Sequence, residues 1–233
     1  MRFFPIKWIP EVFRWSNYEE VWSRIPFLTY YVNTIKLSVI VTVGQIITCS
    51  LAAYSFSKLH YPGRDKIFLC YLATMMVPWH AIMIPQFIIV KSMGLYDSHW
   101  SLIVINLFSA FGVFLLRQFM LGIPEELSEA ARIDGLSEVG IFFRMFIPTM
   151  KSTYAAAIII TFMGAWNNYL WPKVILQNKD AITMPMLVSN LLSGYTVDYG
   201  MLMLGVFICT IPTAIIFFAF QKSFTEGITG AVK

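Results

Sequence analysis

The 233-residue chain contains little charge: Asp, Glu, Lys and Arg together make up 13% of it, whereas 58% of its residues are hydrophobic. With a mean hydropathy of +0.66, it lacks the charge that a soluble domain of this length needs to cover its surface. Charge is absent altogether from residues 37–57, 67–90, 100–116, 152–172 and 199–221. Each stretch is close to or above the roughly 20 residues that cross a hydrocarbon core about 30 Å thick. None alternates with a period of two, which argues against an outer-membrane barrel. We therefore expect an all-α, polytopic membrane protein.

Residues that carry catalysis or bind metals are scarce as well. The three cysteines, Cys49, Cys70 and Cys209, lie in apolar stretches and form no CxxC pair, so they indicate neither disulfides nor a metal site. The histidines are isolated, and the sequence contains no GxxxxGK[ST] phosphate loop. The basic residues are scattered, which gives a nucleic-acid role no support. The sequence predicts a chain that is not an enzyme and that binds no cofactor or metal itself.

The apolar stretches and their flanks predict five transmembrane helices, at about residues 32–57, 67–90, 100–121, 153–170 and 201–220. Pro78 and Pro85 should break or kink the second helix unless neighbouring helices satisfy the freed carbonyls. We expect residues 1–29 to be an extracellular or interfacial segment. Residues 30–221 should form the membrane domain, and residues 222–233 a cytoplasmic tail.

The basic residues predict the orientation of these helices. Lys and Arg occur in the loop after the first span, in the segment between the third and fourth spans, and in the C-terminal tail. Alternating spans place these three regions on one side, which the positive-inside rule assigns to the cytoplasm. The N-terminus then lies outside, although it carries Arg2, Lys7, Arg14 and Arg24. Because a basic exterior terminus is awkward to insert, we expect a further apolar segment before Met1 in the natural reading frame or in a close relative.

One amphiphilic segment, residues 124–148, stands between two charge-free stretches and must reach water at the cytoplasmic surface. It reads PEELSEAARIDGLSEVGIFFRMFIP. Pro124 suits the first position of a helix, and the two glutamates that follow complement the positive end of its dipole. Gly135 suits a left-handed residue at the helix end, and Ser137 can cap a second helix. These signals predict two short helices joined by a glycine, on which Ala130 and Ala131 leave room for another backbone to approach. By its local pattern alone, the segment could equally be an ordinary interfacial loop.

The same segment resembles the EAA loop of ABC-transporter membrane subunits, in which E-L-x-E-A-A-x-I-D-G precedes an apolar helix and a proline. The matching residues are Glu126, Leu127, Glu129, Ala130, Ala131, Ile133, Asp134 and Gly135. Four other motifs resemble the carbohydrate-importer branch, close to its maltose-type second permease subunit; they are NTIKLSV at residues 33–39, AAYSFSKLHYPGR at 52–64, WNNYLWP at 166–172 and the terminal GAVK. Members of that branch usually have six spans, and the first has no counterpart here. Asn168 also departs from the family, because relatives often carry an acidic residue at that place.

The resemblance implies a type I ABC importer permease fold in the cell membrane, with residues 30–221 as the permease domain. It also implies three kinds of partner. A second permease subunit would complete the pore, a cytoplasmic ABC ATPase dimer would use ATP and Mg, and an extracellular solute-binding protein would deliver a sugar. The matched EAA residues would form the helix that couples this chain to the ATPase.

Polar and aromatic residues inside or at the ends of the spans are the candidates for the substrate pathway. They are Gln45, Thr48, Asn106, Trp166, Asn167, Asn168 and Tyr169. Their amides and hydroxyls could bond to sugar hydroxyls, and their aromatic rings could stack on a sugar ring. At each position the alternative is a contact between helices or an interfacial aromatic belt.

Other functions make different demands on the sequence. A glycerol-phosphate importer would favour a basic residue facing the pore, and only Lys36, near one span end, is available. A secondary transporter driven by an ion gradient should show carboxylates within the membrane, and the span interiors contain none. A membrane scaffold without transport activity would make the EAA match a coincidence. Residues 177–200 form a predicted polar excursion outside the cell, longer than a simple turn needs, and we expect it to contact the binding protein.

Overall fold

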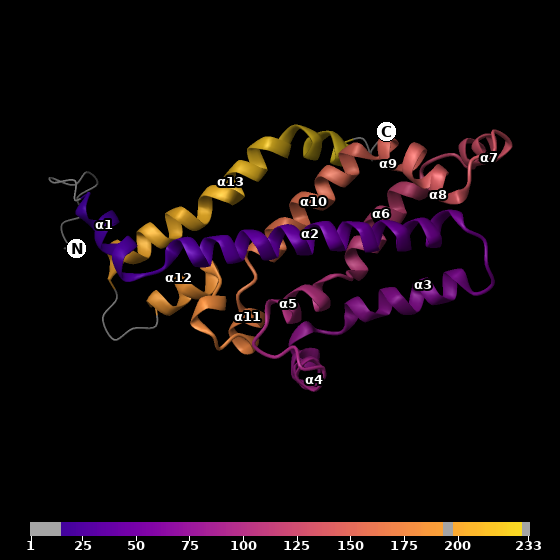
Figure 1. The fold of residues 1–233 in the computed structure, drawn as a ribbon. Coiled ribbons are helices and arrows are strands. Elements are labelled where there is room, and N and C mark those ends of the chain that lie inside the picture. The colour runs from indigo at the N-terminus through magenta and orange to yellow at the C-terminus, as the bar shows by residue number, and fades with distance from the viewer. Residues whose placement is uncertain (1–14, 193–197, 230–233) are drawn as a thin grey trace.

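The computed structural model describes residues 15–192 and 198–229, and within these ranges the regular structure is entirely helical (Figure 1). Its central element is α2 (Phe27–Lys58), a helix of 32 residues that follows the short α1 (Ser16–Arg24). α2 begins about five residues before the predicted first span, because Phe27 and Tyr30 are apolar enough to be buried against other helices of the chain. At about 1.5 Å per residue, α2 is long enough to cross a bilayer with some tilt.

Three helical segments are long and apolar enough to cross a membrane, namely residues 27–58, 99–121 and 199–221. Two further segments pass the same test only as bent pairs of helices, with bends of 101° and 83°. The described residues therefore contain up to five spans, as the sequence predicts, but the second and fourth are not the simple rods that hydropathy suggests.

The second span breaks where its first proline lies. α3 (Arg64–Ala73) runs into the 3-10 turn η1 (Thr74–Met76), and α4 (Trp79–Ser92) begins after Pro78. Proline disfavours the helical conformation in the residue before it, and Val77 is accordingly extended. Pro85 stays inside α4, so only one of the two predicted proline sites interrupts the span.

The third span is also interrupted, which the sequence does not predict. α5 (His99–Asn106) and α6 (Ala110–Leu121) are separated at Leu107–Ser109. The Ser109 side chain accepts a hydrogen bond from the Gly112 amide and caps the new helix.

The predicted surface segment forms α7 (Glu125–Ile133) and α8 (Glu138–Ile141), as expected from its caps. The second surface helix continues through a π-helical stretch, η2 (Phe142–Phe146), into α9 (Ile147–Thr149). A bend then leads into α10 (Lys151–Trp166), and α11 (Leu170–Ile175) follows a break at Asn167–Tyr169.

The excursion at residues 177–200 is less polar in three dimensions than its sequence suggests. It contains η3 (Lys179–Ala181) and α12 (Met184–Leu192), and α12 buries Met184, Met186 and Leu187. α12 packs beside α13 (Tyr199–Thr229), whose helix extends into the predicted C-terminal tail. Most of the excursion that the structure describes is therefore part of the packed fold rather than a free loop.

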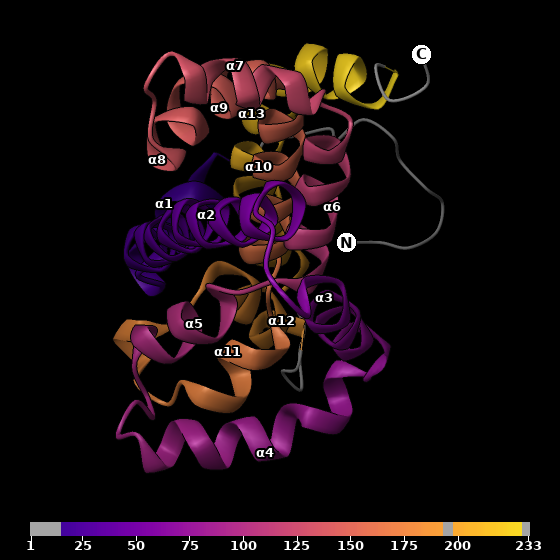
Figure 2. The same cartoon turned by 90° about the vertical axis from the view of Figure 1, so that its right-hand side faces the viewer.

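α2 packs chiefly against α6 and α10, and α13 lies on α10 (Figures 1 and 2). The turn after α2 lies at the same end of the molecule as α7 and α8, whereas α1 and α12 lie toward the opposite end (Figure 1). This arrangement agrees with the orientation expected from charge, in which the loop after the first span and the segment before the fourth share one side.

Candidate functional site

α7 ends in a glycine turn that the sequence specifies closely. Gly135 has a φ of +82°, in the left-handed region that favours glycine. Its amide donates to the Arg132 carbonyl, and the Leu136 amide donates to the Ala131 carbonyl, each at 3.0 Å. These two bonds form a Schellman motif, which satisfies carbonyls that would otherwise lack partners. Ser137 then accepts from the Gly140 amide and starts α8, so the reversal is held on both sides.

The exposed face of α7 carries half of the predicted coupling residues. Glu126, Glu129, Ala130 and Ile133 follow one another at helical spacings of three, one and three residues and are all exposed. Ile133 is 86% exposed, which is unusual for a large aliphatic side chain. Leu127, Asp134 and Gly135 are exposed beside this stripe. We call the four residues of the stripe the α7 face.

Ala131 does not belong to the α7 face. It is 3% exposed and packs into the chain's own core, on the side of α7 that also buries Ser128. The sequence predicts that both alanines are accessible to another backbone, but only Ala130 is exposed. A bulky substitution at Ala131 would overpack this chain itself.

An ion pair that the sequence analysis did not single out ties the two surface helices together. Arg132 Nε donates to Glu138 Oε1 at 2.8 Å. This bond to the carboxylate raises the pKa of the Arg132 guanidinium. In the sequence, a basic residue stands at the end of α7 and an acidic residue at the start of α8. These two residues can form an ion pair only because the glycine turn brings the two helices together.

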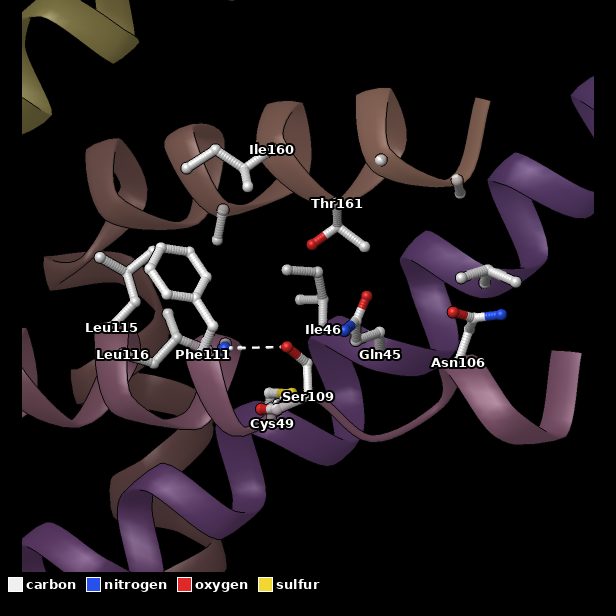
Figure 3. Close-up of a pocket in the computed structure, with 15 residues that line it drawn as sticks. Gln45, Ile46, Cys49, Asn106, Ser109, Phe111, Leu115, Leu116, Ile160 and Thr161 are labelled. Carbon is white, nitrogen blue, oxygen red and sulfur yellow. Dashed lines mark hydrogen bonds between the residues drawn. The ribbon is translucent and has the colours of Figure 1, made fainter. Parts of the chain in front are cut away.

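A cavity of about 280 Å³ lies where the broken third span meets α2 and α10 (Figure 3). Its polar lining comes from Gln45, Asn106, Ser109 and Thr161. The amide nitrogen of Asn106 donates to the Leu102 carbonyl in its own helix. Two of the predicted pathway residues, Gln45 and Asn106, are thus brought to one cavity, together with Ser109 and Thr161, which the sequence analysis missed.

A second cavity of about 470 Å³ adjoins the first and shares Asn106 and Gly164 with it. Its lining includes Asn167, Asn168 and Tyr169, as well as Trp79, His80 and Trp171. The break between α10 and α11 supplies the consecutive amides, and the break before α4 supplies Trp79. Interrupted helices at membrane depth are tolerated where they line a cavity or are buried in protein, and here they do the former.

The other two predicted pathway residues lie elsewhere. Trp166 is 1% exposed, donates from Nε1 to the Cys209 carbonyl at 3.0 Å and stacks on Phe162, so it fastens α10 to α13. The Thr48 hydroxyl donates to the Leu107 carbonyl, which the interruption of the third span leaves without a helical partner. Neither residue lines the two cavities, and both have the helix-joining contacts that the sequence analysis kept as the alternative.

Small residues allow the helices around the first cavity to approach closely. A Cβ atom added to Gly44 would lie 2.4 Å from Leu107 Cδ2, and one added to Gly112 would lie 2.9 Å from Cys49 Sγ. These contacts bring α2 against the break in the third span, as small residues commonly do between membrane helices.

Comparison with known proteins now places this arrangement. A family model described as "binding-protein-dependent transport system inner membrane component" matches residues 45–230, which include the α7 face and every lining residue of the two cavities except Val41. The chain belongs to this family. It is 38% identical over 218 residues to the lactose transport system permease protein LacG of Rhizobium radiobacter, covering 94% of this chain and 80% of that protein.

Other relatives of the family support the same placement. The chain is 37% identical over 226 residues to the arabinooligosaccharides transport system permease protein AraQ of Bacillus subtilis, covering 96% of this chain and 80% of that protein. It is 29% identical to the sn-glycerol-3-phosphate transport system permease protein UgpE of Pectobacterium atrosepticum, covering 98% of this chain and 84% of that protein. A solved bacterial ABC transporter involved in the import of the acidic polysaccharide alginate matches with a TM-score of 0.84 and 26% identity, covering 93% of this chain and 81% of its own. The expected ABC importer permease fold, and with it a place in the membrane, is confirmed.

Proposed function

We propose that this chain is the permease subunit of an ABC importer for a neutral sugar, driven by ATP that a partner subunit hydrolyses. The observation that carries the substrate class is the chemistry of the two cavities. Amides, hydroxyls and aromatic rings line them, and no Asp, Glu, Lys or Arg occurs among their described lining residues. Such a lining suits a solute that offers many hydroxyls and no charge.

The rival substrate is a phosphate ester, which one relative's name suggests for that protein. Phosphate recognition in proteins relies on Arg, Lys or helix amides that supply positive charge. In this chain the basic candidate near the pore, Lys36, lies on the exposed side of α2 and lines neither cavity. Two relatives above 35% identity are named for the transport of lactose and of arabinooligosaccharides, which supports a sugar as the substrate.

The α7 face supports coupling to a cytoplasmic ATPase dimer. It combines two carboxylates with an exposed alanine and an exposed isoleucine on one side of a capped helix. The carboxylates can accept hydrogen bonds from a partner, while Ala130 permits close approach and Ile133 offers an apolar anchor. ATP and Mg would bind in the partner ATPase, since this sequence has no phosphate loop of its own.

The family and the topology support two further partners. A second permease subunit would enclose the cavities from the side that this chain leaves open. An extracellular solute-binding protein would dock on the end that carries η3 and α12. There the side chain of Asn33 donates to the carbonyls of Asp180 and Ile182, which fixes the excursion in place for such a contact.

Uptake by the reconstituted complex tests the substrate and the energy source together. The permease is co-expressed with the second permease, the ATPase and the binding protein encoded beside it, and the complex is placed in proteoliposomes. We expect uptake of labelled lactose or arabinooligosaccharide that requires Mg-ATP on the ATPase side, and no uptake of sn-glycerol 3-phosphate. Preferred uptake of the phosphate ester would overturn the substrate class, and sugar uptake driven by a proton or sodium gradient without ATP would overturn the mechanism.

A further inference from the structure

The C-terminal end of α2 contacts the chain on both sides of α7. Tyr54 donates from its hydroxyl to Glu138 Oε2 at 2.7 Å, and Lys58 donates from Nζ to the Ile123 carbonyl at 2.6 Å. Ile123 lies two residues before the start of α7, and Glu138, the first residue of α8, lies five residues after its end. Tyr54 and Lys58 are four residues apart, so they project from the same face of α2.

Both side chains are buried where apolar residues would be simpler to accommodate. Tyr54 and Lys58 are each 5% exposed. The Tyr54 ring packs edge-on against Phe142 and Phe146 at centroid distances of 5.3 and 5.1 Å, and the Lys58 ammonium lies 5.6 Å from the Phe146 ring centre. Burying an ammonium among aromatic rings is unfavourable unless it gains a specific partner, so a purely space-filling role does not account for Lys58.

The Glu138 carboxylate extends the contact into α7. One of its oxygens accepts from Tyr54 and the other from Arg132, in the last turn of α7. The chain of bonds therefore runs from α2 through α8 to α7. At the other end of α7, the bond from Lys58 fixes the residue before Pro124. α7 is thereby held at both ends by a single helix.

The same helix forms a wall of the first cavity. Val41, Gln45, Ile46 and Cys49 line that cavity, and Gln45 lies nine residues before Tyr54. At 1.5 Å per residue this is a distance of about 14 Å along an α-helix. α2 contains no proline, so this length has no built-in hinge of that kind.

We propose that Tyr54 and Lys58 clamp the coupling helix α7 to α2, so that a displacement of α7 by the ATPase moves the Gln45 wall of the cavity as part of the same rigid body. The proposal rests on the proposed role of α7 in ATPase coupling and adds the route by which the movement reaches the solute. It also gives a structural reason for the AAYSFSK motif, whose tyrosine and lysine make the two attachments. Tyr54 and Lys58 are positioning residues, since neither touches the solute cavity.

The test separates coupling from assembly in the reconstituted complex. Tyr54→Phe removes one hydroxyl and keeps the ring, and Lys58→Met keeps the length of the side chain without its charge. For the double variant Y54F/K58M we expect normal co-purification of the ATPase and ATP hydrolysis that still proceeds. Solute uptake per ATP hydrolysed should fall at least about tenfold, because the double variant loses two hydrogen bonds that each involve a charged group.

Matched variants distinguish this result from general damage. Tyr154→Phe removes a buried hydroxyl from the same cluster that makes no described hydrogen bond to α7 or α8, and we expect it to leave coupling unchanged. Lys58→Arg keeps a cationic donor and should restore most of the uptake per ATP. An unchanged uptake per ATP in Y54F/K58M would overturn the clamp. A loss of uptake and ATP hydrolysis in equal proportion would overturn it as well, because such a loss indicates less folded protein rather than weaker coupling. If the wild-type complex fails to retain the ATPase, the proposed coupling role of α7 is wrong instead.

Discussion

The glycine that ends α7 offers a clean test of the coupling surface. A Cβ atom added to Gly135 would meet nothing within 4 Å, so the effect of Gly135→Val comes from its backbone conformation alone. At a φ of +82°, an L-residue costs roughly 1–2 kcal/mol, and a β-branched residue lies at the upper end of that range. This is a factor of about 5 to 30 in the population of the closed turn.

The chain contains a matched control for this strain. Gly94 ends α4 with a φ of +72°, in the same pair of bonds: its amide donates to Lys91, and the Leu95 amide donates to Val90. A Cβ atom there also meets nothing within 4 Å, and Gly94 follows α4, a helix that lies far from α7 (Figure 1). Gly94→Val therefore introduces similar local strain without touching the coupling surface.

We expect Gly135→Val to lower ATPase co-purification and solute uptake by a factor within that range, and Gly94→Val to leave ATPase co-purification unchanged. Gly135→Asn should be close to wild type, because asparagine tolerates the left-handed conformation. Equal loss of ATPase in the two valine variants would show that overall stability, not the α7 turn, controls assembly. Full association in Gly135→Val would refute the role of the turn.

Three further predictions concern the cavities and the outer surface. Asn106→Ala should reduce sugar uptake at least about tenfold while ATPase co-purification stays normal, because Asn106 lines both cavities and its loss leaves a solute hydroxyl unpaired. Unchanged uptake would show that Asn106 is not part of the pathway. The pKa of Asp97 is held below its ordinary value by hydrogen bonds from the Asn178 and Gln177 amides. The two hydrogen bonds to the Asp97 carboxylate should therefore persist in mild acid and weaken only as the pH falls through that lowered pKa. Hydrogen exchange at residues 177–178, corrected for intrinsic rates, should stay constant from pH 7 to about pH 5 in the wild type, and in Asp97→Asn it should be faster already at pH 7. Asn190→Cys, on the exposed part of α12, should cross-link to the binding protein, and the absence of any cross-link along residues 177–200 in every nucleotide state would argue against docking there.

The sequence predicts best those features that are determined within one turn of the chain. The glycine turn after α7, the cap at Ser137 and the break at Pro78 are all set by residues beside them, and all three appear as expected. The orientation of α7 is different. The nine residues of α7 carry small side chains on two sides and do not reveal which alanine faces the core. The packing of Ala131 into the buried cluster built around residues of α2, α6 and η2 decides it.

The interruption of the third span shows why other features stay hidden. Residues 107–109 contain no proline or glycine, and the break is stabilised by Thr48, 59 residues away from Leu107 in sequence. The burial of Trp166 depends in the same way on the Cys209 carbonyl of α13. α12 escaped prediction although most of its residues are apolar, because it is too short to span a membrane, polar residues flank it, and only its packing beside α13 makes it part of the core. Contacts of this kind are absent from any local window of the sequence.

The interruption of the third span also has an electrostatic consequence. α5 ends at Asn106 and α6 begins at Ala110, so the partially negative end of one helix and the partially positive end of the other open beside the first cavity. For an ion of either sign, two opposite half-charges only three residues apart largely cancel. A hydroxyl group both donates and accepts hydrogen bonds, so it can use each end separately. If the first cavity is part of the solute path, as we propose, the break would favour uncharged, hydroxyl-rich solutes over ions, although no Asp, Glu, Lys or Arg occurs among its described lining residues.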